Sequence, residues 1–188
     1  MIREFQASDA QAASHLICRN LREVNCWDYP LEVIEQLIQE YTPERLLRMT
    51  AEGYTFTFEK GGIPTGILRI LPAQGAPQVY WLRTLFVSPD YHGQGIGRQL
   101  VEAGEQFARQ KGGAVVRLCA SLTAHRFYQK LGYIDLSHTP DSNGLYLMKK
   151  DLSISDHFYN GNLRSTLFPV DPYDFWAFPK NSFCKLFL

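Results

Sequence analysis

Residues 79–97 read Val-Tyr-Trp-Leu-Arg-Thr-Leu-Phe-Val-Ser-Pro-Asp-Tyr-His-Gly-Gln-Gly-Ile-Gly, an apolar run that leads directly into a glycine-rich turn. The apolar part is typical of a β-strand, and the residues after the turn favour a helix. Glycines at 93, 95 and 97 leave the backbone without Cβ obstruction, so successive N–H groups can converge on an anion at the positive end of that helix. The stretch therefore predicts a phosphate-binding turn between a strand and a helix.

Two better-known phosphate-binding loops do not fit this spacing. A Walker loop needs Lys and then Ser or Thr after its second glycine, but five residues after Gly93 stands Arg98, followed by Gln99. A dinucleotide-binding fingerprint needs a glycine where Arg98 stands and an acidic residue near Val115. The spacing therefore excludes a P-loop and argues against NAD.

The turn instead resembles the acyl-coenzyme A loop of the GCN5-related N-acetyltransferase (GNAT) superfamily. That loop reads Arg or Gln, two residues, Gly, any residue, then Gly or Ala, and here it corresponds to His92, Gly93, Gln94, Gly95, Ile96 and Gly97. The preceding strand matches at Leu85, Phe86, Val87 and Pro89, and a downstream signature matches at Ala124, Phe127, Tyr128, Gly132 and Tyr133. Because two motifs occur in the right order on the expected elements, the resemblance is more specific than a lone glycine loop.

Composition narrows the class of protein. A chain of 188 residues with 45% hydrophobic content can bury one substantial core. Lys plus Arg and Asp plus Glu both number 19, so no global field favours nucleic acid. The four cysteines, Cys18, Cys26, Cys119 and Cys184, lack metal or redox spacing, and no signal peptide or membrane-length apolar run is evident. We expect a cytoplasmic, metal-free protein with neither nucleic acid nor membrane as partner.

Periodicity and turn residues predict an α/β domain. Strands are expected over 2–5, 54–59, 65–71, 79–87, 114–119 and in a last hairpin closed by 145–148. Helices are expected over 8–21, 30–41, 97–111 and 122–131, with a further short helix over 42–49. Together with the resemblance, this implies a single GNAT-like domain over residues 1–152. Its mixed, mostly antiparallel sheet should have about seven strands, a splayed central parallel pair and about four flanking helices.

Residues 153–188 differ in character, because aromatic residues and prolines alternate there. Prolines at that density are incompatible with a regular helix. The aromatic residues favour burial against the domain or against a second copy, which would make a homodimer, whereas the alternative is an extension without a role.

The resemblance implies where acetyl-CoA binds. Backbone N–H groups of the glycine loop would hold the pyrophosphate, and the strand edge before it would hold the pantetheine arm. The implied cofactor-binding residues are Leu85, Phe86, Val87, His92, Gly93, Gln94, Gly95, Ile96, Gly97, Arg98, Ser121 and Phe127. Two of them depart from the family pattern, because His92 replaces Arg or Gln and Ser121 replaces Asn. Ser121 also fits an ordinary helix cap, and His92 would make cofactor affinity depend on pH.

Tyr128 aligns with the tyrosine that serves as general acid in many members of the family. Thiols have a pKa near ~8.5 and tyrosine near ~10, so the phenol would assist the leaving thiolate only as charge develops. The alternative for Tyr128 is a core aromatic packed on Phe127. The glutamate that many relatives carry on the strand over 80–83 is missing, and Glu23, Asp28 and Glu59 are the acidic candidates for a general base.

The acceptor side is less well defined by the sequence. Trp27, Asp28 and Tyr29 form a candidate substrate-binding rim beside Cys26, in which Asp28 would attract an ammonium group, although the two aromatic residues fit a core equally well. Cys119 suggests an acyl-cysteine intermediate, but a cysteine in an apolar strand is usually a small hydrophobe, so we expect direct transfer.

The sequence therefore predicts an acetyl-CoA-dependent N-acetyltransferase acting on a primary amine of a small molecule or of a peptide or protein terminus. A non-catalytic acyl-CoA-binding regulatory module is the main alternative, and an interaction scaffold built around the aromatic tail is a third.

Overall fold

The computed structural model describes residues 1–152, so the predictions made for the tail lie outside the described residues. Seven strands of this region form one sheet in the order β1-β2-β3-β4-β5-β7-β6. Their bounds are β1 Ile2–Glu4, β2 Tyr54–Lys60, β3 Ile63–Ala73, β4 Ala76–Val87, β5 Val115–Ala120, β6 Ile134–Asp135 and β7 Tyr146–Asp151. Of the neighbouring pairs among these seven strands, only β4 and β5 run parallel. The predicted mixed, mostly antiparallel sheet is confirmed.

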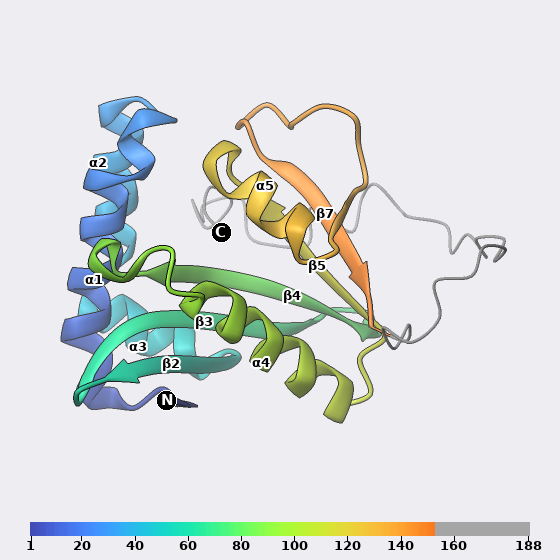
Figure 1. Cartoon of the computed structure of the whole chain (residues 1–188), viewed down its shortest axis with the longest axis horizontal. Coiled ribbons are helices and arrows are strands. Elements are labelled where there is room, and N and C mark those ends of the chain that lie inside the picture. The colour runs from blue at the N-terminus through green and yellow to red at the C-terminus, as the bar shows by residue number, and fades with distance from the viewer. Residues whose placement is uncertain (153–188) are drawn as a thin grey trace, which may run out of the picture.

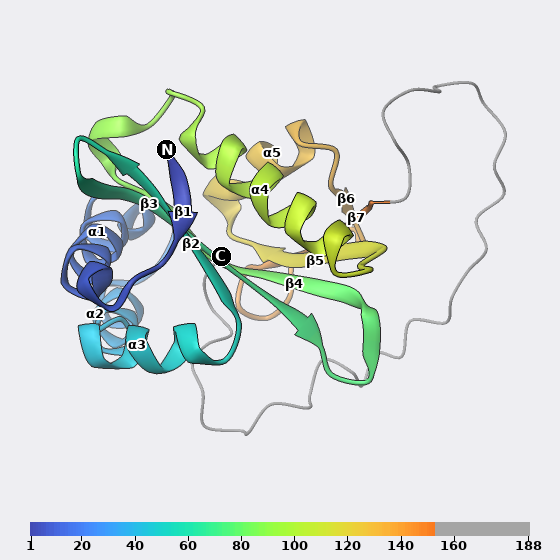
Figure 2. The same cartoon turned by 90° about the horizontal axis from the view of Figure 1, so that it is seen from below.

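Five α-helices flank the sheet in the described part of the chain: α1 Ala10–Glu23, α2 Leu31–Glu40, α3 Pro43–Ala51, α4 Ile96–Gln110 and α5 Leu122–Lys130. Figures 1 and 2 show α1, α2 and α3 grouped together on one side of the sheet, and α4 on the other side. Each side has its own core: one cluster joins α4 and α5 to the sheet, and the other joins α1, α2 and α3 to it. None of the helices in this region combines the length and apolarity needed to cross a membrane.

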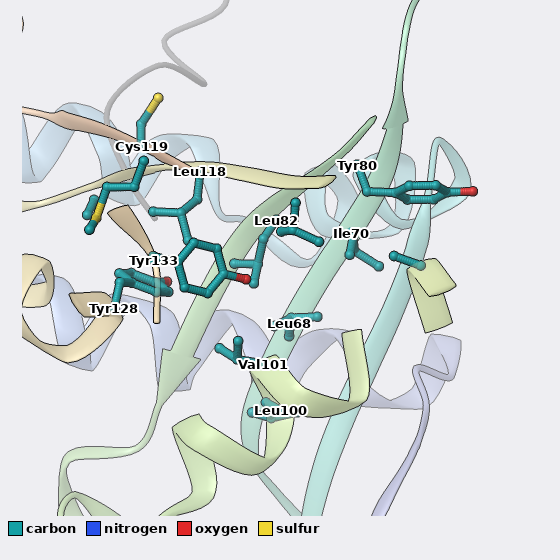
Figure 3. Close-up of a cluster of buried hydrophobic side chains, with 14 of the residues drawn as sticks. Leu68, Ile70, Tyr80, Leu82, Leu100, Val101, Leu118, Cys119, Tyr128 and Tyr133 are labelled. Carbon is teal, nitrogen blue, oxygen red and sulfur yellow. The ribbon is translucent and has the colours of Figure 1, made fainter. Parts of the chain in front are cut away.

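Helix α4 packs very close to the sheet because two glycines leave room for it. A Cβ on Gly66 of β3 would lie 2.8 Å from Leu100 Cδ1, and one on Gly104 of α4 would lie 2.9 Å from Leu68 Cδ2. Figure 3 shows the buried Leu68, Leu82 and Leu118 side chains on the side of the sheet where α4 presents Leu100 and Val101. This packing fixes where the N-terminus of α4 meets the end of β4.

A bulge in β4 opens the sheet at its centre. The β3·β4 register shifts between Ile67 and Arg69, opposite a stretch of β4 in which Thr84 has φ 56°. A positive φ is unusual for a β-branched residue and marks a strained backbone. Pairing between β4 and β5 is confined to residues 79–81 and 115–117, so the strands then part. The splay expected between 85–87 and 118–120 is confirmed.

Candidate functional site

A cavity of about 460 Å³ lies where the two parallel strands part. It is bounded by the end of β4, the turn into α4, the start of α5 and the end of α1. Its lining consists of Asn20, Val24, Asn25, Leu85, Phe86, Val87, Tyr91, His92, Gly93, Gly95, Ile96, Gly97, Arg98, Ser121, Thr123, Ala124, Phe127 and Tyr128. Among the residues predicted from the sequence to bind the cofactor, all but Gln94 are in this lining.

The glycine turn presents the positive end of α4 to the cavity. Gly93 and Gly95 have φ of 75° and 79°, a left-handed conformation that suits glycine. Gly95 is the N-cap of α4, no side chain in the described region caps it, and the first turn of the helix carries no acidic residue. The first N–H groups of a helix have no intrahelical acceptor, so the start of α4 offers free donors to an anion.

Gly97 has a separate reason to be glycine. A Cβ at this position would lie 3.3 Å from Cζ of Phe127, which reaches the start of α4 from α5. The ring and the backbone therefore meet at the cavity wall, and a larger side chain at this position would compete with Phe127 for the same space.

The backbone of Val87 faces the gap between the strands. Ser88 N–H donates to the Thr65 carbonyl, whereas Val87 stands opposite Gly66 in the neighbouring, non-hydrogen-bonded position. The Val87 carbonyl accepts from Asn20 Nδ2 and from His92 Nε2, both at 2.8 Å. Two donors occupy its two lone pairs, so the expected pantetheine contact is left to other backbone groups of this strand edge.

Tyr128 lies between the core and the cavity. Its side chain is fully buried, its ring packs against Phe127 and Tyr133, and its hydroxyl has no hydrogen-bond partner in the described part of the chain. Burial raises the pKa of Tyr128 well above its ordinary value, so the phenol stays protonated at neutral pH. Tyr128 lines the cavity, and a buried hydroxyl without a partner can donate to a bound group.

The start of α5 is held from two directions. The Ser121 hydroxyl accepts from Ala124 N–H at 3.3 Å and so acts as the helix cap. Asp28, which follows the short 3₁₀ turn Asn25–Trp27, accepts from the Thr123 N–H at 3.0 Å and from its hydroxyl. This contact joins the α1–α2 connection to α5, and it engages the carboxylate that the sequence suggested for an ammonium group.

None of the three predicted substrate-rim residues lines the cavity. Trp27 is 85% exposed, and Asp28 is bonded to Thr123. Tyr29 is partly buried, and burial, assisted by the charge of Asp28, raises the pKa of its hydroxyl to about 12. Gln94 does not line the cavity either. Its side-chain carbonyl accepts from Lys60 Nζ at 3.1 Å.

Within the described residues, no Asp or Glu lines the cavity. Glu59 is paired with Arg3 at 2.7 Å between β1 and β2, and Glu23 is paired with Arg19 at 2.9 Å. Cys119 does not line it either, and burial raises the pKa of its thiol to about 11. No cluster of potential metal ligands is found among residues 1–152.

Several residues of the site were missed by the sequence reasoning. Asn20 carries a recognisable signal, since it is a buried amide on the apolar face of α1 and must find partners, here the carbonyls of Leu16 and Val87. Thr84 carries none, because the sequence does not reveal that a threonine adopts a left-handed φ. Tyr91, Asn25 and Thr123 line the cavity through turns whose placement depends on the whole fold.

Comparison with known proteins agrees with this geometry. The sequence profile of the Acetyltransferase (GNAT) family matches residues 19–133. The chain belongs to this acetyltransferase family. Over 130 residues it is 31% identical to N-acetyltransferase family 8 member 2 of Rattus norvegicus, a match that covers 65% of this chain and 56% of the rat protein.

GNAT structures share the fold at low sequence identity. PaiA N-acetyltransferase from Thermoplasma acidophilum, solved in complex with coenzyme A, superposes with a TM-score of 0.71 at 20% identity, covering 80% of this chain and 98% of that chain. The aminoglycoside 6'-N-acetyltransferase from Enterococcus faecium gives 0.63 at 19% identity, covering 82% and 98% respectively.

Proposed function

We propose that this protein transfers an acetyl group from acetyl-CoA directly to a primary amine of a small molecule or of a peptide or protein terminus. One observation carries the proposal. The uncapped start of α4, the open edge of β4 and Tyr128, whose hydroxyl has no partner, all line the same cavity in the described region. We place this activity in residues 1–152, in the cytoplasm.

The residues present fit coenzyme A at the level of the backbone. The free N–H groups from Gly95 to Arg98 would hold the pyrophosphate at the start of α4. The exposed Arg98 side chain stands beside them and adds positive charge. Phe127 would pack against the bound carrier at Gly97, and the edge of β4 from Leu85 to Val87 would take the amide arm. Acetyl-CoA supplies the acetyl thioester when bound.

Tyr128 is the group we propose as proton donor to the departing thiolate. Its raised pKa enlarges the gap to an ordinary thiol, near ~8.5, beyond the ~1.5 units expected from reference values. Full transfer of the proton is therefore more strongly uphill than the sequence suggested. The phenol would act mainly as a hydrogen-bond donor that stabilises negative charge as it develops.

Direct transfer is favoured over an acyl-cysteine intermediate. Cys119 is buried, and with a pKa of about 11 it is almost entirely protonated at neutral pH. The thiolate is the nucleophilic form of cysteine, so this side chain is a poor candidate for attack on a thioester.

A non-catalytic acyl-CoA-binding module is the second candidate, and one observation favours it. A primary amine with pKa near ~10 must lose a proton before it can attack, yet no carboxylate from residues 1–152 lines the cavity. If the protein is an acetyltransferase, either water accepts this proton or the amine binds in its neutral form.

Thiol release distinguishes the two candidates. Purified full-length protein is mixed with acetyl-CoA and a panel of primary amines, and free coenzyme A is measured with a chromogenic thiol reagent. Amine-dependent release supports the acetyltransferase. Thermal stabilisation by acetyl-CoA, without release of coenzyme A in the presence of any amine, supports the binding module. If acetyl-CoA gives neither stabilisation nor release of coenzyme A, both candidates are contradicted.

A further inference from the structure

A row of basic side chains crosses the sheet on the face turned away from α4. It consists of Arg69 on β3, Arg83 on β4, Arg117 on β5 and Lys149 on β7, and we call it the cation row. Arg69 stands opposite Arg83, and Arg117 stands opposite Lys149 and beside Trp81. Directly opposed residues share one face of a sheet, as do residues two apart on a strand, so the four side chains project to the same side.

The opposite face confirms this orientation. Leu68, Leu82, Leu118 and Met148 each adjoin a member of the cation row, and all four are fully buried in the cluster beneath α4. Figure 3 shows Leu118 directed toward Tyr128 and Tyr133, whereas the sulfur of its neighbour Cys119 points to the other side of β5. Cys119 thus shares the face of Arg117, two residues along the same strand.

Within the described part of the chain, only the two outer members of the row have carboxylate partners. Arg69 bonds to Glu52 at 3.4 Å, and Lys149 bonds to Asp151 at 3.2 Å. Within residues 1–152 no carboxylate pairs with Arg83, whose guanidinium lies 4.6 Å from the centre of the Trp81 ring. Arg117 Nε is buried and has no hydrogen-bond partner in the same region.

This arrangement is electrostatically unfavourable without an anion. Like charges that stand opposite one another in a ladder destabilise the sheet, and a buried guanidinium N–H without a partner costs free energy as well. A carboxylate between Arg83 and Arg117 would relieve both effects. The planar guanidinium group suits this role, because its parallel N–H donors match the two oxygens of a carboxylate.

The inner arginines also lie at the point where β4 and β5 part. Trp81 and Arg117 are the last paired residues of the two strands, and Arg83 lies two residues beyond Trp81 on β4. Leu85, which lines the cavity, is two residues further along β4, beyond the bulge at Thr84. An anion held at Arg83 would therefore lie next to the part of β4 that lines the cavity.

Other elements converge on the same place. After burial, the charge of Arg83 is the next influence on the pKa of Cys119, which it lowers, while that of Asp141 raises it. Asp141, in the loop before β7, also contributes to the raised pKa of Tyr29. Its carboxylate accepts from the backbone N–H groups of Asn143 and Leu145, so its position is fixed by the loop. Arg83 and Asp141 thus both lie close enough to Cys119 to influence its thiol.

We propose that the acceptor is a small amine that carries a carboxylate, and that Arg83 and Arg117 bind this carboxylate so that the amine points toward the cavity at Leu85. The proposal rests on the acetyltransferase function proposed above and narrows its substrate to an amino-acid-like class. The same two guanidinium groups would repel polyamines and other polycationic acceptors.

Matched acceptors test the proposal with the full-length protein. Each of a series of α- and ω-amino acids is compared with its carboxamide, in which a neutral group of similar shape replaces the carboxylate. We expect kcat/KM to favour the best acid over its amide by at least tenfold. Arg83→Gln and Arg117→Gln should each raise KM for the acid at least tenfold, without changing KM for the amide or the affinity for acetyl-CoA.

Two further variants isolate the geometry from the charge. Arg48→Gln, at an exposed position of α3, removes the same charge elsewhere and should leave the preference for the acid intact. Arg83→Lys keeps the charge without the planar donors and should recover only part of the affinity. Melting temperatures identify any variant that fails to fold, in which case Arg83→Lys provides the comparison.

The outcomes separate this inference from the function on which it rests. Acetylation of acids and amides with equal efficiency, or a preference that both arginine variants retain, overturns the carboxylate site and leaves the acetyltransferase intact. If no amine is acetylated, the proposed acetyltransferase function is rejected. The carboxylate site is then tested by calorimetric titration of amino acids into protein saturated with coenzyme A. Binding that Arg83→Gln weakens tenfold supports the site, and absence of binding rejects it.

Discussion

The two sides of the splayed strands are built in different ways. On the side of the donor cavity, the main features belong to the backbone: left-handed glycines, the uncapped start of α4 and the open edge of β4. On the proposed acceptor side, they are side chains, above all the inner arginines of the cation row. A backbone site imposes glycine at fixed spacing and so leaves a motif in the sequence. A site of charged side chains from separate strands leaves no such motif.

The difference also concerns what each side can select. Free N–H groups at a helix start accept any suitably shaped phosphate, so the donor cavity suits a carrier common to the whole family. Under the proposal above, Arg83 and Arg117 would discriminate by the charge and shape of the acceptor. We infer that specificity in this protein is determined on the acceptor side, and the predictions below test the division.

Removing one hydroxyl on the donor side should have the largest effect. Tyr128 lines the cavity, and Tyr128→Phe keeps its buried ring but deletes the hydroxyl, which is unpartnered within residues 1–152. We expect turnover to fall by about 10²-fold, the lower range for loss of a general acid, with acetyl-CoA affinity unchanged. Steady-state kinetics and calorimetry measure the two effects separately.

The matched control is Tyr133→Phe, which removes a hydroxyl from a buried neighbouring ring that does not line the cavity. Comparable losses in the two variants, or a loss below about threefold in Tyr128→Phe, would exclude the proposed role.

Two glycines with the same backbone conformation separate affinity from stability. Gly95 and Gly62 both have φ of 79°, and a Cβ on either would meet nothing within 4 Å in the described region. Alanine at either position should lower the free energy of unfolding by about 1–2 kcal/mol, the cost of a left-handed residue with a side chain. Only Gly95→Ala should also weaken acetyl-CoA binding, by roughly tenfold, because it perturbs the donors at the start of α4. Equal affinity in the two variants would show that the turn does not hold the anion.

The sequence anticipated the glycine turn that lines the cavity, but not the contacts made by residues from separate segments, for physical reasons. Gly93 and Gly95 adopt a left-handed backbone conformation that suits glycine, so a short stretch of sequence was enough to place the turn. The bonding of Asp28 to Thr123 depends on two segments distant in sequence, and it was not anticipated. The pairing of Arg83 with Arg69 across the ladder depends on the bulge at Thr84, which no local pattern announces.

The bulge that opens the sheet can be tested through its strain. Thr84→Gly relieves a positive φ, which offsets the entropy cost of glycine, about 0.5–1 kcal/mol, and the loss of a buried side chain. We expect a change of less than about 1 kcal/mol in the free energy of unfolding. Thr55→Gly, at a buried position of β2 without positive φ, should cost more. If both variants lose the same stability in denaturant titrations, the strain at Thr84 is contradicted.

The smallest effect on turnover is expected at Cys119. Cys119 is buried with a pKa of about 11, so Cys119→Ala should retain turnover to within about threefold. The wild-type enzyme should likewise remain active after treatment with an alkylating reagent at neutral pH. Complete loss of acetyl transfer in a folded Cys119→Ala protein would instead establish an acyl-cysteine intermediate.

Calorimetric titration of the full-length protein with acetyl-CoA tests the central claim most directly. The structure predicts one molecule bound per chain in the cavity at the start of α4. Gly97→Leu should abolish that binding, because even a Cβ at this position would lie 3.3 Å from Phe127 Cζ and a leucine side chain would compete with the ring for the cavity wall. Absence of binding by folded wild-type protein, or undiminished affinity in Gly97→Leu, would contradict the account.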